Sequence, residues 1–442
     1  MADDLMTRVY RVFDPAPLEA DQDDLYVELD DVRGEAGVVP RLADRIRLSG
    51  EYTCQLLSGH HGSGKSTELK RLKGVLESGN KRFFVVYCEA KSDLDVNDVD
   101  FPEVLIAVVR QVAKQLQEHA GIKLKPGYFR DRFDRLKRFL GSDVDFETVG
   151  LAAGLLNISA TIKSSPDARA EIRKALEPDM GNLLDAANDV IGEAILELRK
   201  KDHAGLVILV DDLDKIVLRP HEAARCSTAE YLFVHRQPQL SAFECHVVYT
   251  MPLSLAYSVQ QGEIASRYGA RVPVIPMTKI AHRPPNRKSY KPGFDRFREI
   301  IAARLRRASV EQEAVFETGK VRDRLVELSG GQPRELMILI REAIVGGTLP
   351  ITDAAVDRAH AEGKRAYARQ LSDEHAKIID SVRSNGSLKR TQTNDALARE
   401  LLDSRAVLQY VNDEEWYGVN PLISEPKPKA RPKAKPKARK SK

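Results

Sequence analysis

A glycine-rich octapeptide between an apolar run and an amphipathic run constrains this chain more than any other feature. Residues 59–66 have the sequence Gly-His-His-Gly-Ser-Gly-Lys-Ser and match the pattern GxxxxGK[ST] at every fixed position. The preceding run, Thr53–Leu57, has the length and composition of a buried strand, and Ser66–Lys73 has helical spacing. A strand, a glycine-rich turn and a helix in this order predict a phosphate-binding loop, or P-loop.

Each position of this loop has a physical task in binding a nucleotide. Gly62 and Gly64 let backbone N–H groups converge on phosphate oxygens, and the N-terminus of the following helix adds a positive dipole. Lys65 would bridge the terminal phosphates, and Ser66 would offer its hydroxyl to Mg²⁺. The predicted nucleotide-binding residues are Gly59, His60, His61, Gly62, Ser63, Gly64, Lys65, Ser66 and Thr67.

The two adjacent histidines of the loop, His60 and His61, could suggest a metal site. No further set of ligands accompanies them at these variable positions. We therefore expect both to be solvent-facing loop residues.

A second apolar run ends in carboxylates. Leu206–Val210 is followed by Asp211-Asp-Leu-Asp214, so a buried parallel strand would deliver these acids to the carboxyl edge of a sheet, where ligands bind. We expect Asp211 to hold Mg²⁺, directly or through water, and Asp212 to orient or deprotonate the attacking water. For Asp214 we expect a structural role in capping a turn.

Two further residues complete the predicted catalytic set of Lys65, Asp212, Thr250 and Arg334. Thr250 ends the apolar run His246–Thr250 and would lie beside the γ-phosphate if that strand neighbours the strand of Asp211; a hydroxyl that only caps the strand is the alternative. Arg334 starts a helix and could reach back to the phosphates, or could be an exposed helix-terminal arginine.

Arg267 and Arg271 are candidates of a different kind, because each could reach the nucleotide of a neighbouring subunit. Ordinary surface arginines are the alternative for both.

The periodicity of the remaining chain predicts an α/β fold, with a parallel sheet flanked by helices. The five expected strands are Thr53–Leu57, Arg82–Cys88, Leu206–Val210, His246–Thr250 and Arg271–Ile275. The main expected helices are Val39–Leu48, Pro102–Glu118, Phe294–Arg307, Lys320–Leu328, Arg334–Ala343 and Thr393–Leu402. From about 406 to 419, a strand, a polar turn over Asn412–Glu415 and a second strand follow the last helix, which is the order of a winged helix.

A chain of 442 residues exceeds the roughly 100–200 residues of one domain, so several folded units are expected. The predicted order is an N-terminal lead-in segment over 1–50, in which the helix Val39–Leu48 covers the entrance of the nucleotide domain, and a P-loop core over 51–280 with an insertion at about 120–200. A helical lid over 293–350, a winged-helix-like domain over 352–424 and a disordered basic tail over 425–442 follow.

Composition restricts the cellular setting. The four cysteines form no CxxC pair, which argues against a disulfide framework and a zinc site and favours a reducing, cytoplasmic location. The acidic N-terminus lacks the pattern of a secretory signal. The least polar long stretch, Val149–Ile162, is shorter than the roughly 20 residues that span a bilayer, so we expect it to be buried, with no membrane partner.

Positive charge is concentrated in two places. Residues 426–442 hold nine Lys or Arg and no acid, and removing them from the net charge of +4 leaves −5 for the rest of the chain. A charged segment between about 120 and 180 carries a second group, Lys123, Lys125, Arg130, Arg132, Arg135, Lys137 and Arg138. Nucleic acid is therefore a possible partner of the tail, although a solubilising extension is the alternative.

Together, residues 59–66, Leu206–Asp214, Thr250 and Gly331-Gln-Pro-Arg334 resemble the AAA+ and STAND branch of P-loop ATPases over about 30–345. The resemblance implies an ATPase core with ATP and Mg²⁺ as cofactors, in which Thr250 matches the first sensor and Arg334 the second. The C-terminal helices and the segment starting at Trp416 look like the winged helix that such proteins often append. Asp212 stands where the motors of this branch usually have glutamate, and the span between Lys65 and Asp211 is long, so the resemblance favours a slow switch over a fast motor.

Three functional hypotheses follow. The first is a Mg²⁺-dependent ATPase that acts as a nucleotide-gated switch, forming homo-oligomers or binding a partner protein, in bacterial signalling or anti-phage defence. The second is a DNA-binding regulator or loader that grips DNA with the winged helix and the basic tail. The third is a nucleotide kinase, for which the sequence shows no clear acceptor pocket.

Overall fold

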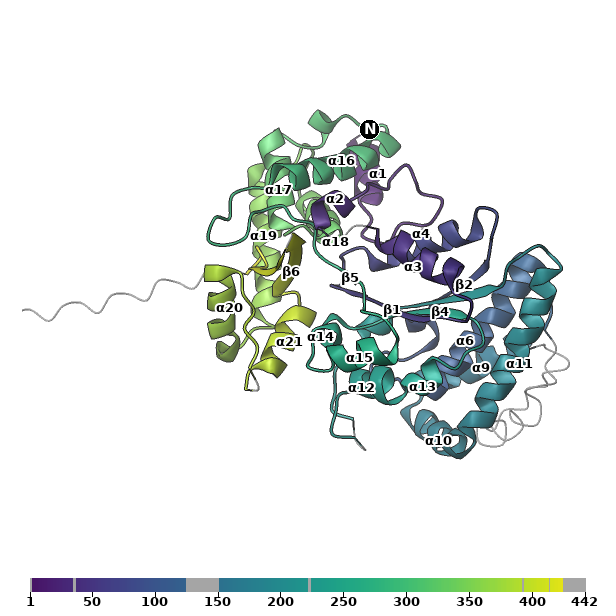
Figure 1. Ribbon diagram of the computed structural model, residues 1–442. Coiled ribbons are helices and arrows are strands. Elements are labelled where there is room, and N and C mark those ends of the chain that lie inside the picture. Colours follow the sequence, from purple (N-terminus) through teal and green to yellow (C-terminus); the bar gives the residue numbers. More distant parts are fainter. Residues whose placement is uncertain are drawn as a thin grey trace, which may run out of the picture.

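The centre of the protein, seen in a computed structural model, is a five-stranded parallel sheet (Figure 1). The structure describes residues 2–34, 37–124, 151–221, 224–391, 393–412 and 414–423. The strands lie in the order β2-β3-β4-β1-β5. Their bounds are β1 Cys54–Gly59, β2 Phe84–Glu89, β3 Leu206–Asp211, β4 His246–Thr250 and β5 Val274–Ile275. All five predicted strands are present, which confirms the predicted α/β fold.

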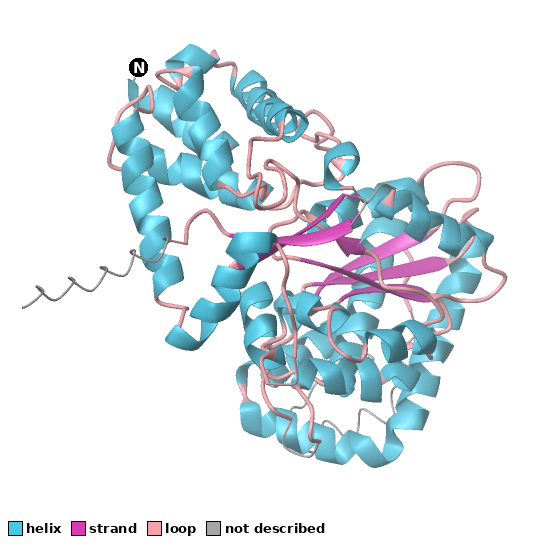
Figure 2. Cartoon of the chain, turned by 60° about the vertical axis from the view of Figure 1, so that its left-hand side comes forward, coloured by secondary structure: helices cyan, strands magenta, loops and turns pink. Residues whose placement is uncertain are grey.

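Helices cover both faces of this sheet (Figures 1 and 2). On one face, α3 (Val38–Leu48) and α4 (Lys65–Glu77) pack against strand residues such as Leu57, Val207 and Val248. On the other face, α6 (Phe101–Gln115) and α11 (Met180–Arg199) pack against β2 and β3. Two further helices lie on this side, where α9 (Leu151–Ser164) packs on α6 and α10 (Pro166–Leu176) packs on α9. Alternate strand residues point to opposite faces, so a sheet covered on both sides needs continuous apolar runs.

The predicted insertion at about 120–200 corresponds, within the described residues, to α9, α10 and α11. Leu155, Ile158 and Ile162 of α9 are buried in the core, whereas Leu156 is 50% exposed, so the expected burial of Val149–Ile162 holds for only part of its described residues. Ion pairs join α10 to the rest of the domain, since Arg173 contacts Asp98 at 2.7 Å. Most of the predicted basic group, Lys125, Arg130, Arg132, Arg135, Lys137 and Arg138, lies outside the described residues.

A second apolar core is formed by the lid helices together with the first helix of the chain. The elements are α1 Ala2–Val12, α16 Lys291–Ala308, α17 Gly319–Leu328, α18 Pro333–Ile344 and α19 Asp353–Ala368. Val9 and Phe13 are fully buried in this core, which attaches the N-terminal helix to the lid rather than to the sheet. We call these five helices the lid body.

Two helices and a hairpin end the described chain. They are α20 Asp373–Asn385, α21 Asp395–Asp403, β6 Val407–Asn412 and β7 Glu414–Val419, with β6 and β7 antiparallel. The predicted turn at Asn412–Glu415 is shorter than expected, because Glu415 already pairs with Val411 in the ladder. The order of elements is the predicted one, and the winged-helix-like domain remains a prediction. The predicted disordered tail over 425–442 lies outside the described residues.

The remaining short helices connect these units. They are α2 Asp30–Arg33, α5 Ala90–Asp93, α12 Thr228–Glu230, α13 Gln237–Leu240, α14 Leu253–Ala256 and α15 Gln261–Arg267. The four cysteines are free. Among the described residues, no helix is both long and apolar enough to cross a membrane.

Candidate nucleotide-binding site

The glycine-rich loop connects the end of β1 to the start of α4 and has the backbone that its glycines predict. Gly62 and Gly64 have φ angles of +84° and +109°, in the region that disfavours a side chain. A Cβ atom on Gly59 would lie 2.6 Å from the carbonyl oxygen of Ile275. Only glycine therefore allows β5 to approach the first residue of the loop.

Lys65, the first residue of α4, is almost fully buried inside the loop. Its ammonium donates to the carbonyl oxygens of Gly59 at 2.6 Å and His60 at 2.9 Å. It also forms an ion pair with Asp214 Oδ2 at 2.8 Å. An ammonium has three N–H donors, so these three acceptors satisfy it completely.

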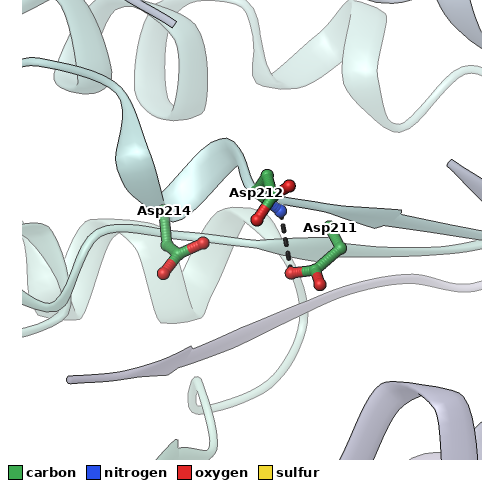
Figure 3. A group of neighbouring side chains, drawn as sticks. All are labelled: Asp211, Asp212 and Asp214. Atoms are coloured by element: carbon green, nitrogen blue, oxygen red, sulfur yellow. Dashed lines mark hydrogen bonds between the residues drawn. The ribbon is translucent and has the colours of Figure 1, made fainter. Parts of the chain in front are cut away.

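Three carboxylates lie close together at the end of β3 and directly after it (Figure 3). Asp211, Asp212 and Asp214 are all buried, and each offers one oxygen within 4.8 Å of the others. Asp211 accepts hydrogen bonds from the backbone N–H of Asp212 at 2.7 Å, from the Tyr87 hydroxyl at 2.6 Å and from the Ser66 side chain. The P-loop and the acidic strand end thus face each other.

The chemistry of these donors fits a magnesium ion. Mg²⁺ prefers oxygen ligands, and Ser66 and Asp211 present a hydroxyl and a carboxylate that are already hydrogen-bonded to each other. Burial, followed by the charge of Asp214, raises the pKa of Asp211 despite the hydrogen bonds from Ser66 and Tyr87. A divalent cation would offset this cost, because it stabilises the ionised carboxylate.

Asp212 occupies a constrained position directly after the strand. Its φ angle is +69°, and its carboxylate is held by Lys215 and by Lys91, the latter at 3.3 Å. The side chain is therefore near the site but engaged by two cations. Its predicted role as the base or water-orienting group remains a prediction.

The expectation that Asp214 only caps a turn is wrong. Asp214 is 4% exposed and directly contacts Lys65, so it belongs to the site. Burial would raise the pKa of Asp214, but the charges of Lys65 and His61 outweigh burial and lower it. The position of Asp214, three residues after Asp211 at the strand end, was the only sequence signal for this contact.

Thr250 lies at the end of β4, which separates β3 from β1 in the sheet. The condition set for its sensor role, a strand next to that of Asp211, is thus met. The fully buried Thr250 hydroxyl accepts a hydrogen bond from the backbone N–H of Asp214 at 3.4 Å. A capping role and a sensor role are both compatible with this geometry.

Arg334 is at the start of α18 and lies directly over the P-loop. A Cβ atom on Gly62 would be 3.1 Å from the Cβ of Arg334. The guanidinium donates from Nε to the carbonyl oxygen of Pro15 at 3.3 Å. The structure therefore brings Arg334 to the phosphate-binding loop, rather than leaving it exposed at a helix end.

The pocket between the P-loop and the lid is closed by the N-terminal segment, and not by α3 as expected. α3 is instead packed on α4 because its apolar stripe, including Leu42 and Ile46, needs a partner. Residues 14–18, residues 25–27 and Leu29 line the pocket together with Ile300 and Met337 of the lid body. The backbone N–H of Leu18 donates to the Thr67 hydroxyl at 3.1 Å, which fixes this segment to α4.

Arg33 is a site residue that the sequence analysis missed. Its guanidinium donates to the carbonyl oxygen of Ser63 at 2.6 Å and to Glu68 at 3.0 Å, and it is 4% exposed. Arg33 therefore links Ser63 of the P-loop to Glu68 of α4. Neither its spacing nor its neighbours in the sequence signal this contact.

The expectation that His60 is solvent-facing is also wrong, because the residue is buried. Only 1% of it is exposed, and its Nε2 accepts a hydrogen bond from the backbone N–H of Gln409 at 2.9 Å. Burial, with a smaller contribution from Lys65, lowers the pKa of His60 to about 3, so the ring is neutral. His61 is half-buried, and burial lowers its pKa to about 4.

A second cavity, of about 400 Å³, borders the phosphate end of the site. His61, Asp214 and Lys215 form its inner wall. The outer wall comes from the C-terminal helices and includes Glu400 and Asp403. The C-terminal helices and the P-loop residue His61 therefore border one cavity.

The two candidate trans-acting arginines are on or near the outer surface. Arg267 forms an ion pair with Glu263, one helical turn away, at 2.7 Å. Arg271 is exposed. Within one chain both have the environment of ordinary surface arginines, and a role in a neighbouring subunit remains a prediction.

A P-loop that faces acidic side chains at the carboxyl edge of a parallel sheet defines a P-loop nucleotide-binding fold. This conclusion rests on the geometry of the chain itself. The predicted roles of the individual residues remain predictions.

The solved structures that are similar to this chain share little sequence identity with it. No family model matches the sequence, and no curated protein matches it. The Walker-type ATPase of Pyrococcus abyssi has 12% identity and a TM-score of 0.46, covering 93% of this chain and 98% of that one. The ORC2 protein of Aeropyrum pernix has 14% identity, a TM-score of 0.40 and 93% coverage of both chains. The ORC1 protein of Aeropyrum pernix in complex with DNA has 14% identity and a TM-score of 0.40, covering 91% of this chain and 92% of that one.

Proposed function

We propose that this chain is a Mg²⁺-dependent ATPase that acts as a nucleotide-gated switch. The observation that supports the proposal is that Lys65, Ser66, Asp211 and Asp214 contact one another in one cluster, in which only Ser66 is not fully buried. Ser66 and Asp211 would hold the metal ion, which would polarise the terminal phosphate. Lys65 would exchange Asp214 for phosphate oxygens, and Arg334 would approach them from the lid.

Slow hydrolysis fits the environment of Asp212. A general base must be free to accept a proton from water. The carboxylate of Asp212 is instead paired with Lys215 and Lys91, so both cations compete with a water molecule for its oxygens. Such a site favours a long-lived nucleotide state, as a switch requires.

The pocket walls indicate how a nucleotide would control conformation. The P-loop, the N-terminal segment and the lid body each contribute part of the wall. A nucleotide that contacts all three stabilises the closed arrangement by its differential affinity for that state. The apolar wall around Leu25 and Met337 suits the adenine base. The resemblance of the P-loop sequence to that of bacterial proteins linked to signalling or defence implies a role in bacterial signalling or anti-phage defence.

Calorimetry with ATP and with ADP, each with Mg²⁺, tests the binding step. Wild type should bind both nucleotides, Lys65→Ala should lose most of the affinity, and Lys114→Ala, at an exposed lysine on α6, should bind like wild type. Phosphate release then measures hydrolysis. Light scattering with each nucleotide tests for oligomers. Failure of wild type to bind either nucleotide would refute the proposal.

A DNA-binding regulator or loader is the second candidate, supported by the β6–β7 hairpin that directly follows α21. DNA binding through the C-terminal tail would weaken steeply as salt rises, because counterions are released from the phosphates. Removal of residues 426–442 should then abolish it. Binding that is independent of salt and of these residues would contradict this candidate.

The nucleotide kinase hypothesis gains one observation. The cavity beside Asp214 and Lys215 is large enough for a small acceptor molecule. Phosphate release without transfer to an added acceptor would favour the ATPase.

A further inference from the structure

The strand β6 contacts the nucleotide-binding loop directly, although the two segments are 349 residues apart in the sequence. The Nε2 atom of His60 accepts the backbone N–H of Gln409 at 2.9 Å. Both residues are buried, with exposed fractions of 1% and 0%. A buried donor that loses its acceptor costs free energy, so this bond constrains both segments.

The hydrogen bond is one link in a continuous series. Lys65 donates to the carbonyl oxygen of His60 at 2.9 Å, and the ring of His60 accepts from Gln409. The carbonyl oxygen of Gln409 accepts the backbone N–H of Met277, next to β5, at 3.0 Å. The side chain of Gln409 donates to the Tyr257 hydroxyl at 2.7 Å. The ammonium expected to meet phosphate is thus connected to β6 through His60.

The neighbouring residue on β6 contacts the lid instead. The Tyr410 hydroxyl donates to the carbonyl oxygen of Gly330 at 2.7 Å, in the turn between α17 and α18. A Cβ atom on Gly330 would lie 2.8 Å from Leu408 of the same strand. This turn leads directly into Arg334 above the P-loop. Consecutive residues of β6 therefore hold the P-loop and the lid turn.

We propose that His60 is a positioning residue that makes the C-terminal hairpin a structural part of the nucleotide site, so that nucleotide binding and the placement of the hairpin are coupled. The inference rests on the proposed nucleotide-binding function and specifies how that site is regulated. Because the bond fixes the P-loop in its binding conformation, its loss should weaken nucleotide binding. Because such coupling is reciprocal, a bound nucleotide should slow the exchange of backbone amide hydrogens in the hairpin.

The chain contains its own reporter for this coupling. Trp416, the single tryptophan, is on β7 and stacks on Tyr410 with ring centroids 4.3 Å apart. Its emission therefore reports the hairpin and not the nucleotide pocket. Hydrogen–deuterium exchange of the backbone amides of residues 405–412, measured by mass spectrometry, reports on the segment that contains the amide of Gln409.

Two substitutions separate the hydrogen bond from the shape of the side chain. His60→Leu keeps an apolar volume but removes the acceptor, whereas His60→Gln can place an amide oxygen near the position of Nε2. His119→Leu, at an exposed histidine, controls for the exchange of histidine by leucine. Each full-length variant is titrated with ADP and Mg²⁺ by calorimetry and by Trp416 emission.

Wild type should show an emission change that follows the calorimetric binding curve. In His60→Leu we expect binding about tenfold weaker, a smaller emission change and faster exchange of residues 405–412, even without nucleotide. His60→Gln should recover most of each effect, and His119→Leu should match wild type.

Two results would overturn the coupling while leaving the proposed function intact. One is nucleotide binding by wild type with no change in Trp416 emission or in exchange of residues 405–412. The other is a His60→Leu protein that equals wild type in affinity and exchange. If wild type binds no nucleotide by calorimetry, the proposed function itself fails, and the coupling fails with it.

Discussion

Replacing Asp214 by asparagine should tighten the binding of metal-free ADP, because Asp214 competes with phosphate for Lys65. The ammonium of Lys65 has no unused donor, since Gly59, His60 and Asp214 take all three. A phosphate must displace one of these acceptors. Asp214 is the only one with a full negative charge, so it sets most of the cost of displacement.

The size of the effect follows from the change in acceptor. A buried hydrogen bond to a charged group contributes about 1.5–3 kcal/mol, against about 0.5–1.5 kcal/mol for a neutral one. In the Asp214→Asn variant a neutral amide oxygen would replace the carboxylate as acceptor and lower the displacement cost by about 1 kcal/mol, which is a roughly fivefold to tenfold change in Kd.

Calorimetric titration of ADP in EDTA measures the cost of displacing Asp214 from Lys65 without a contribution from a metal ion. EDTA is needed because Asp214 is close enough to Asp211 to influence a bound metal ion as well. Asp380→Asn, at an exposed position on α20, is the matched control and should bind like wild type. Unchanged or weaker ADP binding by Asp214→Asn would show that the ion pair with Lys65 does not oppose the nucleotide.

Three further predictions test separate parts of the site. Arg33→Met should lower the free energy of unfolding in urea by about 3 kcal/mol, because it leaves Glu68 buried without its ion-pair partner. Adding Glu68→Gln to this variant should restore part of the lost stability, and strictly additive effects of the two substitutions would contradict the pairing. Arg334→Ala should weaken ATP binding about tenfold in calorimetry, through loss of a charge-assisted contact with phosphate, and full affinity would exclude the lid arginine from the site. Burial raises the pKa of Asp403 to about 6, so the folded state retains a proton that the unfolded chain releases at lower pH, and stability should fall as the pH rises through 6. Asp403→Asn cannot titrate and should show a smaller difference between urea midpoints at pH 5 and pH 8; an unaltered difference would assign the pH dependence to other groups.

Local patterns allowed much of the fold and part of the site to be predicted from the sequence. The loop 59–66 and the strand Leu206–Asp211 are each continuous in sequence, and the need for phosphate ligands and for two covered sheet faces determines their residue types. Their mutual position followed from the rule that parallel strands end at one edge of the sheet.

The contacts that sequence reasoning missed join distant segments. Arg33 reaches Ser63 across a loop, and His60 meets Gln409, whose contribution is a backbone N–H that any residue except proline could supply. No residue type or spacing marks such a partner. The burial of His60 likewise depends on a hairpin that only the tertiary structure brings to the P-loop.

The wall of the nucleotide pocket joins segments that are far apart in the chain, and this has a consequence for biosynthesis. Pro15 and Arg334, which meet above the P-loop, are 319 residues apart. A ribosome adding about 5–20 residues per second needs roughly 15 seconds or more to make the second partner after the first. For most of that interval the P-loop has been synthesised, but the lid residues that line the pocket have not. We expect a chain that ends before the lid to lack the contact between Arg334 and Pro15, and with it part of the pocket wall.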